Sequence, residues 1–288
     1  MPELPEVETI RRELARVITG KKIVKASVNL PKAVRGSAGF FRKKITGAKI
    51  KSVGRRAKLA VFTLSNGYSF VVHLKMTGQL IYQRRQVLRV GGHPIKGGTQ
   101  GLPNKFTQAV FELADGGALY FNDVRKFGYL QLMLTVELEN FFQKNKYGPE
   151  PLSDSFTFFV FKKLLATKTT TRIKQLLMDQ TFIAGVGNIY ATEICFYARL
   201  SPTRQARSLK SHEVRKLYVG LKSILKSAVH KKGTSMSNYV DAYGQPGDYV
   251  PSLKVYGREG EPCLRCGTII KNLTLGGRGT TYCPRCQK

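Results

Sequence analysis

Apolar positions change their spacing along the chain, from a helical repeat to short alternating runs and back to helical repeats. Near the N-terminus the helical repeat is carried by Val7, Ile10, Leu14 and Ile18. This spacing predicts an amphipathic helix that ends at Gly20. Runs rich in β-branched and aromatic residues follow, separated by Gly or Asn turns, and predict a β-sandwich or a barrel. The expected strands are 23–28, 57–64, 68–74, 78–83, 109–113, 118–122 and 128–134.

The second half of the chain is predicted to be helical. Residues 135–152 are expected to form a helix and then a Gly-Pro break between modules. Beyond the break, helices are expected in segments 155–166, 171–180 and 188–198. A longer helix is indicated by one apolar face, formed by Val214, Leu217, Leu221, Ile224, Leu225 and Ala228. Residues 233–250 are rich in Gly, Ser, Asn, Asp, Tyr and Pro and predict a loop.

The net charge points to a polyanionic partner. The 288 residues include 48 Lys or Arg and 18 Asp or Glu, a net charge of +30. From Leu14 to Phe111 there are 20 Lys or Arg and no carboxylate, so ion pairing within that stretch is impossible. A basic face that is merely solvated is one interpretation. A surface for nucleic-acid phosphates is the favoured one, and it predicts binding that weakens steeply with salt.

The sequence carries no pattern typical of a membrane or secreted protein. No run of about 18 apolar residues exists, and the N-terminus has acidic residues where a signal peptide has an apolar core. We therefore expect a cytoplasmic protein in a reducing compartment, where cysteines hold metal more often than they form disulfides.

Four of the five cysteines form a CxxC, sixteen residues, CxxC pattern: Cys263, Cys266, Cys283 and Cys286. Two such pairs can meet around one tetrahedral ion while the intervening chain folds as a hairpin, so we predict one structural zinc with no role in catalysis. Arg278 lies among glycines in that hairpin and could contact a phosphate or be solvated at the tip. The fifth cysteine, Cys195, is expected in the core.

Pro2 becomes an N-terminal secondary amine once Met1 is removed. An α-amino group is roughly a tenth to a fifth neutral near pH 7.4, against about 0.1% for lysine, so Pro2 is a candidate nucleophile. Its attack on a sugar C1′ would give an iminium that needs no further proton, and Glu3 could shuttle protons beside it. The alternative is structural, because proline and acidic residues also favour a helix start.

The segment DQTFIAGVGNIYATE predicts an anion-binding site. Gly185 and Gly187 precede Asn188 at the expected N-cap of a helix, so backbone amides face outward there. A tight turn between two helices is the alternative. A dinucleotide fingerprint is excluded because a helix, and not a strand, precedes the glycines.

Three residues of the basic module are expected in exposed turns: Met76, Arg125 and Phe127. Exposed Met and Phe are unfavourable for an isolated soluble protein, unless an apolar surface such as a base stack receives them. An enzyme that extrudes a nucleotide must fill the resulting gap and hold the unpaired base, which suits two apolar wedges and one arginine. Ordinary core or surface filling is the alternative for each residue alone.

Several of these motifs together resemble the formamidopyrimidine-DNA glycosylase family. They are PELPEVETIRREL, HLKMTG, DVRKFG, YGPEPL, DQTFIAGVGNIYATE and the terminal VYGREGEPC to YCPRCQ, in this order over the whole chain. The resemblance implies an α+β multidomain fold: an N-terminal β-sandwich with a leading helix, a helical domain with a helix-two-turn-helix motif, and a C-terminal β-hairpin zinc finger. We place the boundaries at 1–134, 135–152 (linker), 153–250 and 251–288.

The resemblance also implies roles for individual residues. Pro2 is the implied Schiff-base nucleophile, Glu3 the acid that helps to open the sugar ring, Glu6 a supporting residue and Lys58 an essential lysine near the lesion phosphates. The residues after Lys58 depart from the family's usual aromatic pattern. The implied DNA contacts are His73, Asn188, Arg278 and Tyr256 for phosphates, and Met76, Arg125 and Phe127 for the gap left by the lesion, with Arg125 reading the opposite cytosine.

The implied activity is that of a bifunctional glycosylase and AP lyase of base excision repair. It would act as a monomer on double-stranded DNA with oxidised purines or abasic sites, by base removal and β,δ-elimination. The segment 84–105 is long and Gly-rich, and 233–250 fits the family's lesion-capping loop only loosely, which leaves substrate preference open. The sister family, endonuclease VIII, favours oxidised pyrimidines, but PELPEVET and DVRKFG favour the purine enzyme. A non-catalytic zinc-ribbon nucleic-acid-binding protein is the alternative from another class, and retention of Met1 would favour it.

Overall fold

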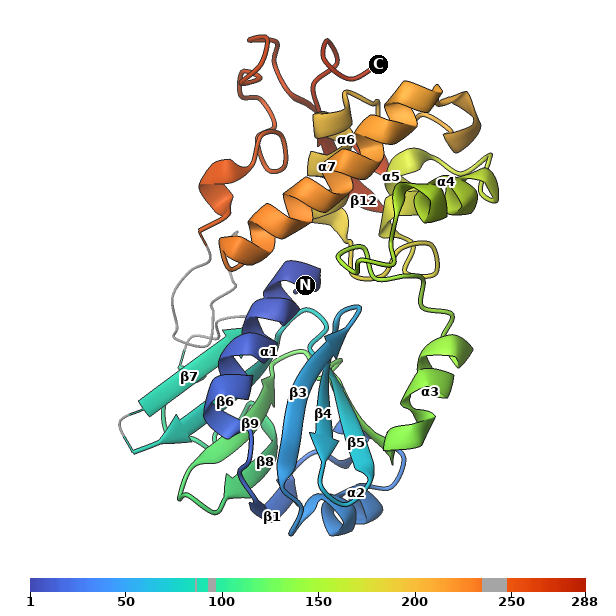
Figure 1. Ribbon diagram of the computed structural model, residues 1–288. Helices are drawn as coiled ribbons and strands as arrows, with labels where there is room; N and C mark the ends of the chain where they lie inside the picture. Colours follow the sequence, from blue (N-terminus) through green and yellow to red (C-terminus); the bar gives the residue numbers. More distant parts are fainter. Residues whose placement is uncertain (86, 93–96, 235–247) are drawn as a thin grey trace. The chain divides into compact units, whose positions relative to one another are not determined.

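The structure, a computed structural model, describes residues 1–85, 87–92, 97–234 and 248–288 (Figure 1). It divides into two compact units. One comprises Met1–Asn145 and Lys231–Val250, and the other comprises Lys146–His230 and Pro251–Lys288. The predicted loops at 84–105 and 233–250 lie partly outside the described residues, and the three predicted boundaries between segments stay predictions. No helix of the described ranges is long and apolar enough to cross a membrane.

The first unit contains two five-stranded sheets. One sheet has the strand order β1 (Ile23–Val28), β8 (Thr107–Leu113), β9 (Ala118–Asp123), β6 (Gly78–Arg84), β7 (Val87–Gly92). The other has the order β2 (Val34–Arg35), β10 (Tyr129–Leu134), β5 (Tyr68–His73), β4 (Leu59–Leu64), β3 (Ile50–Arg56). Neighbouring strands pair antiparallel except β2 and β10, which are parallel.

Aromatic side chains fill the space between the two sheets. Phe62 of β4 and Phe70 of β5 stack with ring centroids 4.5 Å apart, and Phe111 of β8 in the other sheet lies 5.7 Å from Phe70. All three are fully buried. This packing of one sheet on the other confirms the sandwich and excludes the barrel left open by the sequence.

Helix α1 (Leu4–Ile18) leads into the sandwich, as its apolar spacing predicts. Its four periodic apolar residues are at most 1% exposed, and the helix packs against β3 and β7. The contact between α1 and β7 requires glycine at position 91, since a Cβ there would lie 2.7 Å from the Ile10 side chain. The helix ends at Thr19, and Gly20 follows with φ of +83°, a left-handed conformation that glycine adopts freely.

The structure corrects several predicted elements of the first unit. Strands β2, β3 and β7 and helix α2 (Ala38–Ile45) are present but were not predicted. In the segment 135–152, predicted to be a helix and then a Gly-Pro break, the helical part is a 3₁₀ turn at Thr135–Glu137 followed by α3 (Leu138–Lys144).

The second unit is helical with one hairpin. Its elements are α4 (Phe158–Ala166), α5 (Ile173–Met178), α6 (Asn188–Ala198), α7 (Ser211–His230) and the hairpin β11 (Lys271–Leu275) and β12 (Arg278–Tyr282). Helix α6 lies at the centre of the unit, in contact with α5, α7 and β12. The predicted apolar face of α7 is confirmed, because all six residues are buried. Cys195 on α6 is also buried, as predicted.

Candidate active site and metal centre

The N-terminal residues proposed for chemistry lie at the start of α1. Pro2 is buried and Glu3 is 3% exposed, whereas Met1 is 50% exposed. Glu3 is the N-cap of α1, and its backbone N–H donates to Glu6 Oε2 at 2.8 Å, an interaction typical of a capping box. The helix start therefore fixes the backbone next to Pro2.

Glu6 also contacts the C-terminal segment of the first unit, Lys231–Val250. Its Oε1 accepts hydrogen bonds from the backbone N–H of Thr234 at 2.8 Å and from the Thr234 hydroxyl at 3.1 Å. Thr234 forms a β-bridge with Asp248. The buried carboxylate thus links the start of α1 to both residues that flank 235–247.

Lys58 lies in the two-residue connection between β3 and β4 and is 5% exposed. Ala57 before it has φ of +53°, a conformation that costs a non-glycine residue of the order of 1 kcal/mol. Arg55 stabilises this turn, because its Nη1 donates to the Ala57 carbonyl at 2.8 Å and its Nε lies 3.1 Å from Glu8 on α1. The turn that presents Lys58 is in this way attached to the helix that presents Pro2.

His73 ends β5, where it pairs with Leu59, the residue after Lys58. Burial, together with the charges of Lys75, Lys58 and Arg35, lowers the pKa of His73 to about 3. The ring is therefore neutral near pH 7. Its Nδ1 accepts a hydrogen bond from the Lys75 backbone N–H at 3.0 Å, so Nε2 carries the proton and can donate to an oxygen such as that of a phosphate.

The three residues predicted at exposed turns lie together. Met76 is 43% exposed and Phe127 is 60% exposed. Arg125 joins them, with its Nη1 3.0 Å from the Met76 sulfur and its guanidinium 5.0 Å from the centre of the Phe127 ring. Two apolar side chains and one cation thus project from adjacent turns, the arrangement that the sequence indicated.

Asp123 holds these turns in place and was missed by the sequence analysis. It is 1% exposed, and its carboxylate accepts from the Thr77 hydroxyl, the Arg125 N–H at 3.2 Å and the Gly128 N–H at 2.7 Å. An aspartate immediately before an exposed turn was the available signal, because such residues often accept from backbone amides nearby.

In the second unit a buried lysine brings Asn188 and the hairpin together. Lys174 of α5 is 0% exposed, and its Nζ donates to Asn188 Oδ1 and to the Thr280 hydroxyl, each at 2.6 Å. Asn188 itself donates to the Gly279 carbonyl at 3.2 Å. Arg278, at the first position of β12, is exposed beside this group. The Thr280 hydroxyl also donates to the Arg278 carbonyl at 3.1 Å, so two of the four residues predicted to contact phosphates, Asn188 and Arg278, lie on one network. Lys174 was not predicted.

Asn188 does not have the capping role expected from the sequence. Gly187 is the N-cap of α6, and Asn188 is the first helical residue. Gln180 shapes the preceding turn, since it accepts from Gly185 N–H at 2.9 Å and donates to the Val186 carbonyl at 2.7 Å. The side chain of Asn188 instead binds Lys174 and the hairpin.

Tyr256 is half-buried and is positioned by its backbone. Its N–H donates to Glu193 Oε1 at 2.8 Å, and the N–H groups of Lys254 and Val255 bind the same carboxylate. Burial raises the pKa of Glu193, and these amide hydrogen bonds oppose that effect. Glu193 on α6, which was not predicted, thus anchors the chain before the cysteine segment.

The four cysteines of the predicted motif form a site for one metal ion. The sulfurs of Cys263, Cys266, Cys283 and Cys286 all lie within 4.8 Å of one another, and two of them are 3.5 Å apart. Zn–S bonds of about 2.3 Å put tetrahedral sulfurs about 3.8 Å apart, so the donor set suits zinc. Four thiolates leave no position for water, and the ion is structural.

Three family models match consecutive parts of the chain. The formamidopyrimidine-DNA glycosylase N-terminal domain matches residues 1–130, and the helix-two-turn-helix domain of the same enzymes matches residues 147–240. A zinc finger found in these glycosylases and in IleRS matches residues 260–288, which contain the four-cysteine site.

Curated relatives match over the full length. The chain is 42% identical to the formamidopyrimidine-DNA glycosylase of Pelotomaculum thermopropionicum, with 100% of this chain and 99% of the relative covered. It is 38% identical to that of Streptococcus pneumoniae over the same shares of each chain.

Solved structures agree with these relatives. A Lactococcus lactis formamidopyrimidine-DNA glycosylase variant in complex with DNA containing Fapy-dG is 34% identical, with a TM-score of 0.89 and full coverage of both chains. The L. lactis protein with abasic-site DNA is 33% identical, with a TM-score of 0.88 and 99% coverage of both. With identity above 30% along its whole length and all three family models in order, the chain belongs to the formamidopyrimidine-DNA glycosylase family.

Proposed function

We propose that this chain is a bifunctional DNA glycosylase and AP lyase that removes 8-oxoguanine and formamidopyrimidines from duplex DNA. The observation that carries the proposal is the connection between the two proposed catalytic segments. Glu8 of α1 binds Arg55, and Arg55 binds the carbonyl of Ala57 next to Lys58. A buried N-terminal proline and a buried lysine are thus held by one set of contacts.

The proposed reaction uses Pro2 as a secondary amine after Met1 is removed. Its nitrogen attacks C1′, and the damaged base leaves with the electron pair of the glycosidic bond and takes up a proton. The nitrogen loses its proton, the C1′–O4′ bond breaks while Glu3 protonates O4′, and the electron pair on nitrogen forms the iminium. The iminium acidifies C2′, so loss of a C2′ proton expels the 3′ phosphate and a second elimination expels the 5′ phosphate.

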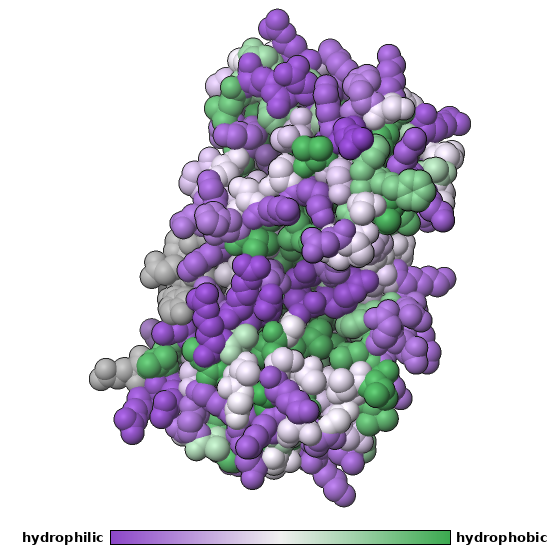
Figure 2. All heavy atoms as spheres, in the orientation of Figure 1, coloured by the Kyte–Doolittle hydropathy of each residue, from purple (hydrophilic) through white to green (hydrophobic). Residues whose placement is uncertain are grey.

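The proposed DNA contacts follow the geometry of each unit. Neutral His73 donates from Nε2 to a phosphate near Lys58, while Asn188, Tyr256 and Arg278 supply donors in the second unit. Met76 and Phe127 fill the gap left by an extruded nucleotide, and Arg125 holds the unpaired cytosine. Hydrophilic side chains predominate on the visible face (Figure 2), consistent with counterion release by many lysines and arginines. We also propose that the protein works in the cytoplasm, at the nucleoid, and its bacterial relatives support that location.

Borohydride trapping tests the proposal directly. The mature protein, with loss of Met1 verified by intact mass, is mixed with a duplex containing 8-oxoguanine opposite cytosine and is then reduced. We expect DNA covalently joined to the N-terminal peptide at Pro2. A trapped adduct on another residue would overturn the nucleophile. If no adduct forms on this duplex, on an abasic duplex or on an oxidised-pyrimidine duplex, the result favours a non-catalytic nucleic-acid-binding protein. If an adduct forms on the oxidised-pyrimidine duplex alone, it favours an activity like that of endonuclease VIII.

A further inference from the structure

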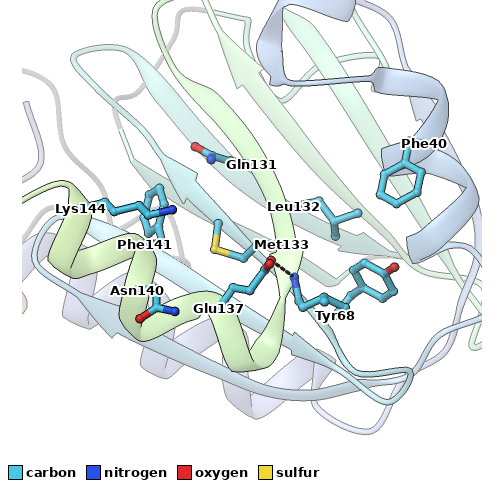
Figure 3. A pocket seen from close by; sticks show the side chains of 10 residues that line it. Phe40, Tyr68, Gln131, Leu132, Met133, Glu137, Asn140, Phe141 and Lys144 are labelled. Carbon is cyan, nitrogen blue, oxygen red and sulfur yellow. Dashed lines mark hydrogen bonds between the residues drawn. The ribbon is translucent and has the colours of Figure 1, made fainter.

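A hollow in the first unit lies apart from every residue assigned above. It measures about 540 Å³ and lies where β10 passes between α2 and α3 (Figure 3). A second hollow of about 600 Å³ continues it toward β2, and the two share Gln131, Phe141 and Lys144. Phe40, Tyr68, Leu132, Met133, Leu134 and Glu137 also line the first hollow.

The hollow follows an open strand edge. Strand β2 pairs with β10 only at Leu130 and Gln131, whereas β5 pairs with β10 along its whole length. Among the strand pairings of the described residues, Leu132–Leu134 therefore have no partner strand on the β2 side. The Leu134 N–H is bound instead by Glu137 at 3.1 Å. An edge of this kind is a template for a further strand.

Apolar side chains line both sides of this edge. Figure 3 shows Leu132 on the side of Phe40 and Tyr68, and Met133 on the side of Phe141. Phe40 is 50% exposed, and its ring lies 6.2 Å from that of Tyr68. Because successive side chains of a strand point to opposite faces, a strand added here would place alternate side chains against these two apolar walls.

The charges around the hollow are mainly positive. Lys44 lies 5.1 Å from the centre of the Tyr68 ring, Lys144 lines both hollows, and Arg35 lines the second. Glu137 is the one acidic residue among those lining the two hollows, and its carboxylate binds the Leu134 N–H. These cations favour an acidic occupant.

We propose that this hollow docks an extended acidic segment of another protein, which adds a strand to β10 and places apolar side chains at alternate positions on either side. Peptide N–H and C=O groups suit the open strand edge, and nucleic acid has no equivalent of that ladder. A second copy of this chain is disfavoured, because each copy carries a net charge of +30.

The first test uses labelled eight-residue peptides and fluorescence anisotropy with the full chain. In one pool Asp or Glu alternates with Phe, Leu, Ile or Val. One control pool has Lys in place of the acids, and another has the same composition with the apolar residues contiguous. We expect the best acidic alternating peptides to bind at least tenfold more tightly than both controls. Equal binding of the three pools would overturn the proposal.

N-methylation of the best peptide tests strand addition itself. Methyl groups on one set of alternate backbone nitrogens should lower affinity at least tenfold, and methyl groups on the other set should change it less than twofold, because a strand presents alternate N–H groups to its neighbour. Equal effects of both sets would show that no strand pairs with β10.

Two variants locate the peptide, and two matched variants control for charge. Phe40→Asp and Lys144→Glu should each lower peptide affinity at least tenfold, whereas Phe159→Asp and Lys163→Glu, on the exposed surface of α4, should not. Base release by all four variants checks folding. Three results would contradict the proposal. One is an equal loss of peptide affinity in the control and the test variants. The others are displacement of the peptide by an equal concentration of a 12-nucleotide single strand, and self-association of the chain that Phe40→Asp abolishes.

Discussion

The Nζ of Lys174 lies 2.6 Å from Asn188 Oδ1, in a position with no solvent exposure. The same ammonium group binds the Thr280 hydroxyl at 2.6 Å and the Gly279 carbonyl at 3.3 Å, so one cation connects α5, the start of α6 and the hairpin. A buried charge is tolerated only where such oxygens replace water. The relative position of Asn188 and Arg278 therefore depends on Lys174.

Replacing Lys174 with Met should weaken both duplex binding and the fold of the second unit. Methionine keeps most of the volume but removes the Lys174 donor from Asn188 Oδ1 and the Thr280 hydroxyl oxygen, at about 1–3 kcal/mol for each buried one. The Gly279 carbonyl keeps its hydrogen bond from Asn188. We expect at least a tenfold rise in the Kd for abasic-site duplex, measured by anisotropy at fixed salt, and a lower Tm.

Lys163→Met, on the exposed surface of α4, is the matched control. It removes one positive charge without breaking the network, so its Kd should rise only a few-fold. If both variants lose the same affinity, the effect of Lys174 is one of net charge and not of position.

Such networks could not be predicted from the sequence, although the motifs could. Asn188 and Arg278 were predicted separately, from a glycine-rich turn and from a glycine-rich hairpin. Their connection depends on a lysine 14 residues before Asn188 and 106 before Thr280. A lysine in a helical repeat looks solvent-exposed in sequence, and only tertiary packing buries it.

Asp123→Ala should reduce the enzyme's preference for cytosine opposite the lesion. The carboxylate accepts from Thr77, Arg125 and Gly128, so its loss frees both turns and costs about 3 kcal/mol of stability. Base-release rates on 8-oxoguanine opposite cytosine and opposite adenine would be compared with those of Arg125→Ala, which should lose the same preference at nearly unchanged stability. Asp154→Ala, at an exposed position, serves as the control. A parent-like cytosine preference in Arg125→Ala would remove Arg125 from the role of reading the opposite base.

The pKa of His73 makes a pH-dependent contribution to stability. It is about 3 in the folded chain against an ordinary value of 6.5, so below pH 6.5 the unfolded chain binds a proton that the folded chain does not. The contribution is complete above pH 6.5 and is lost as pH falls toward 3, by at most about 1.4 kcal/mol per pH unit. Urea unfolding at pH 7.5 and 5.0 should show a larger loss for the parent than for His73→Gln. Equal losses would mean that His73 titrates normally in the folded state.

The boundaries of the elements show where sequence patterns are informative. Helix α7 was predicted because a long apolar repeat needs one buried face. Strand β3 was not, since IKSVGRR is mostly polar and only Ile50 and Val53 are buried. Helix α2 has only eight residues, among them a glycine, and its propensity is weak. Strand β3 forms because it pairs with β4, and α2 forms because it packs against the sandwich. A local pattern reveals neither contact.

Cys283→Ser should release the metal and weaken DNA binding before it affects the first unit. One lost thiolate opens the four-sulfur site, and without the ion the β11–β12 hairpin loses the contacts that place Arg278. We expect less than one equivalent of zinc by elemental analysis and at least a tenfold higher Kd. Cys195→Ala, a buried cysteine outside the site, should keep its zinc. Full zinc content in Cys283→Ser would contradict the ligand assignment.

Pro2→Gly should largely abolish strand nicking while DNA binding persists. Glycine offers only a primary amine, whose imine must be protonated before it withdraws electrons, and it lacks the ring that fixes the nitrogen next to the capped start of α1. We expect nicking of an 8-oxoguanine duplex to slow at least about 100-fold, with the Kd for abasic-site duplex within about threefold of the parent. Intact mass must show that Met1 is absent from both proteins, because with Met1 present the nitrogen is an amide and both would be inactive. If processed Pro2→Gly nicks at the parent rate, Pro2 is not the nucleophile, and Lys58 becomes the first amine to test by the same trapping experiment.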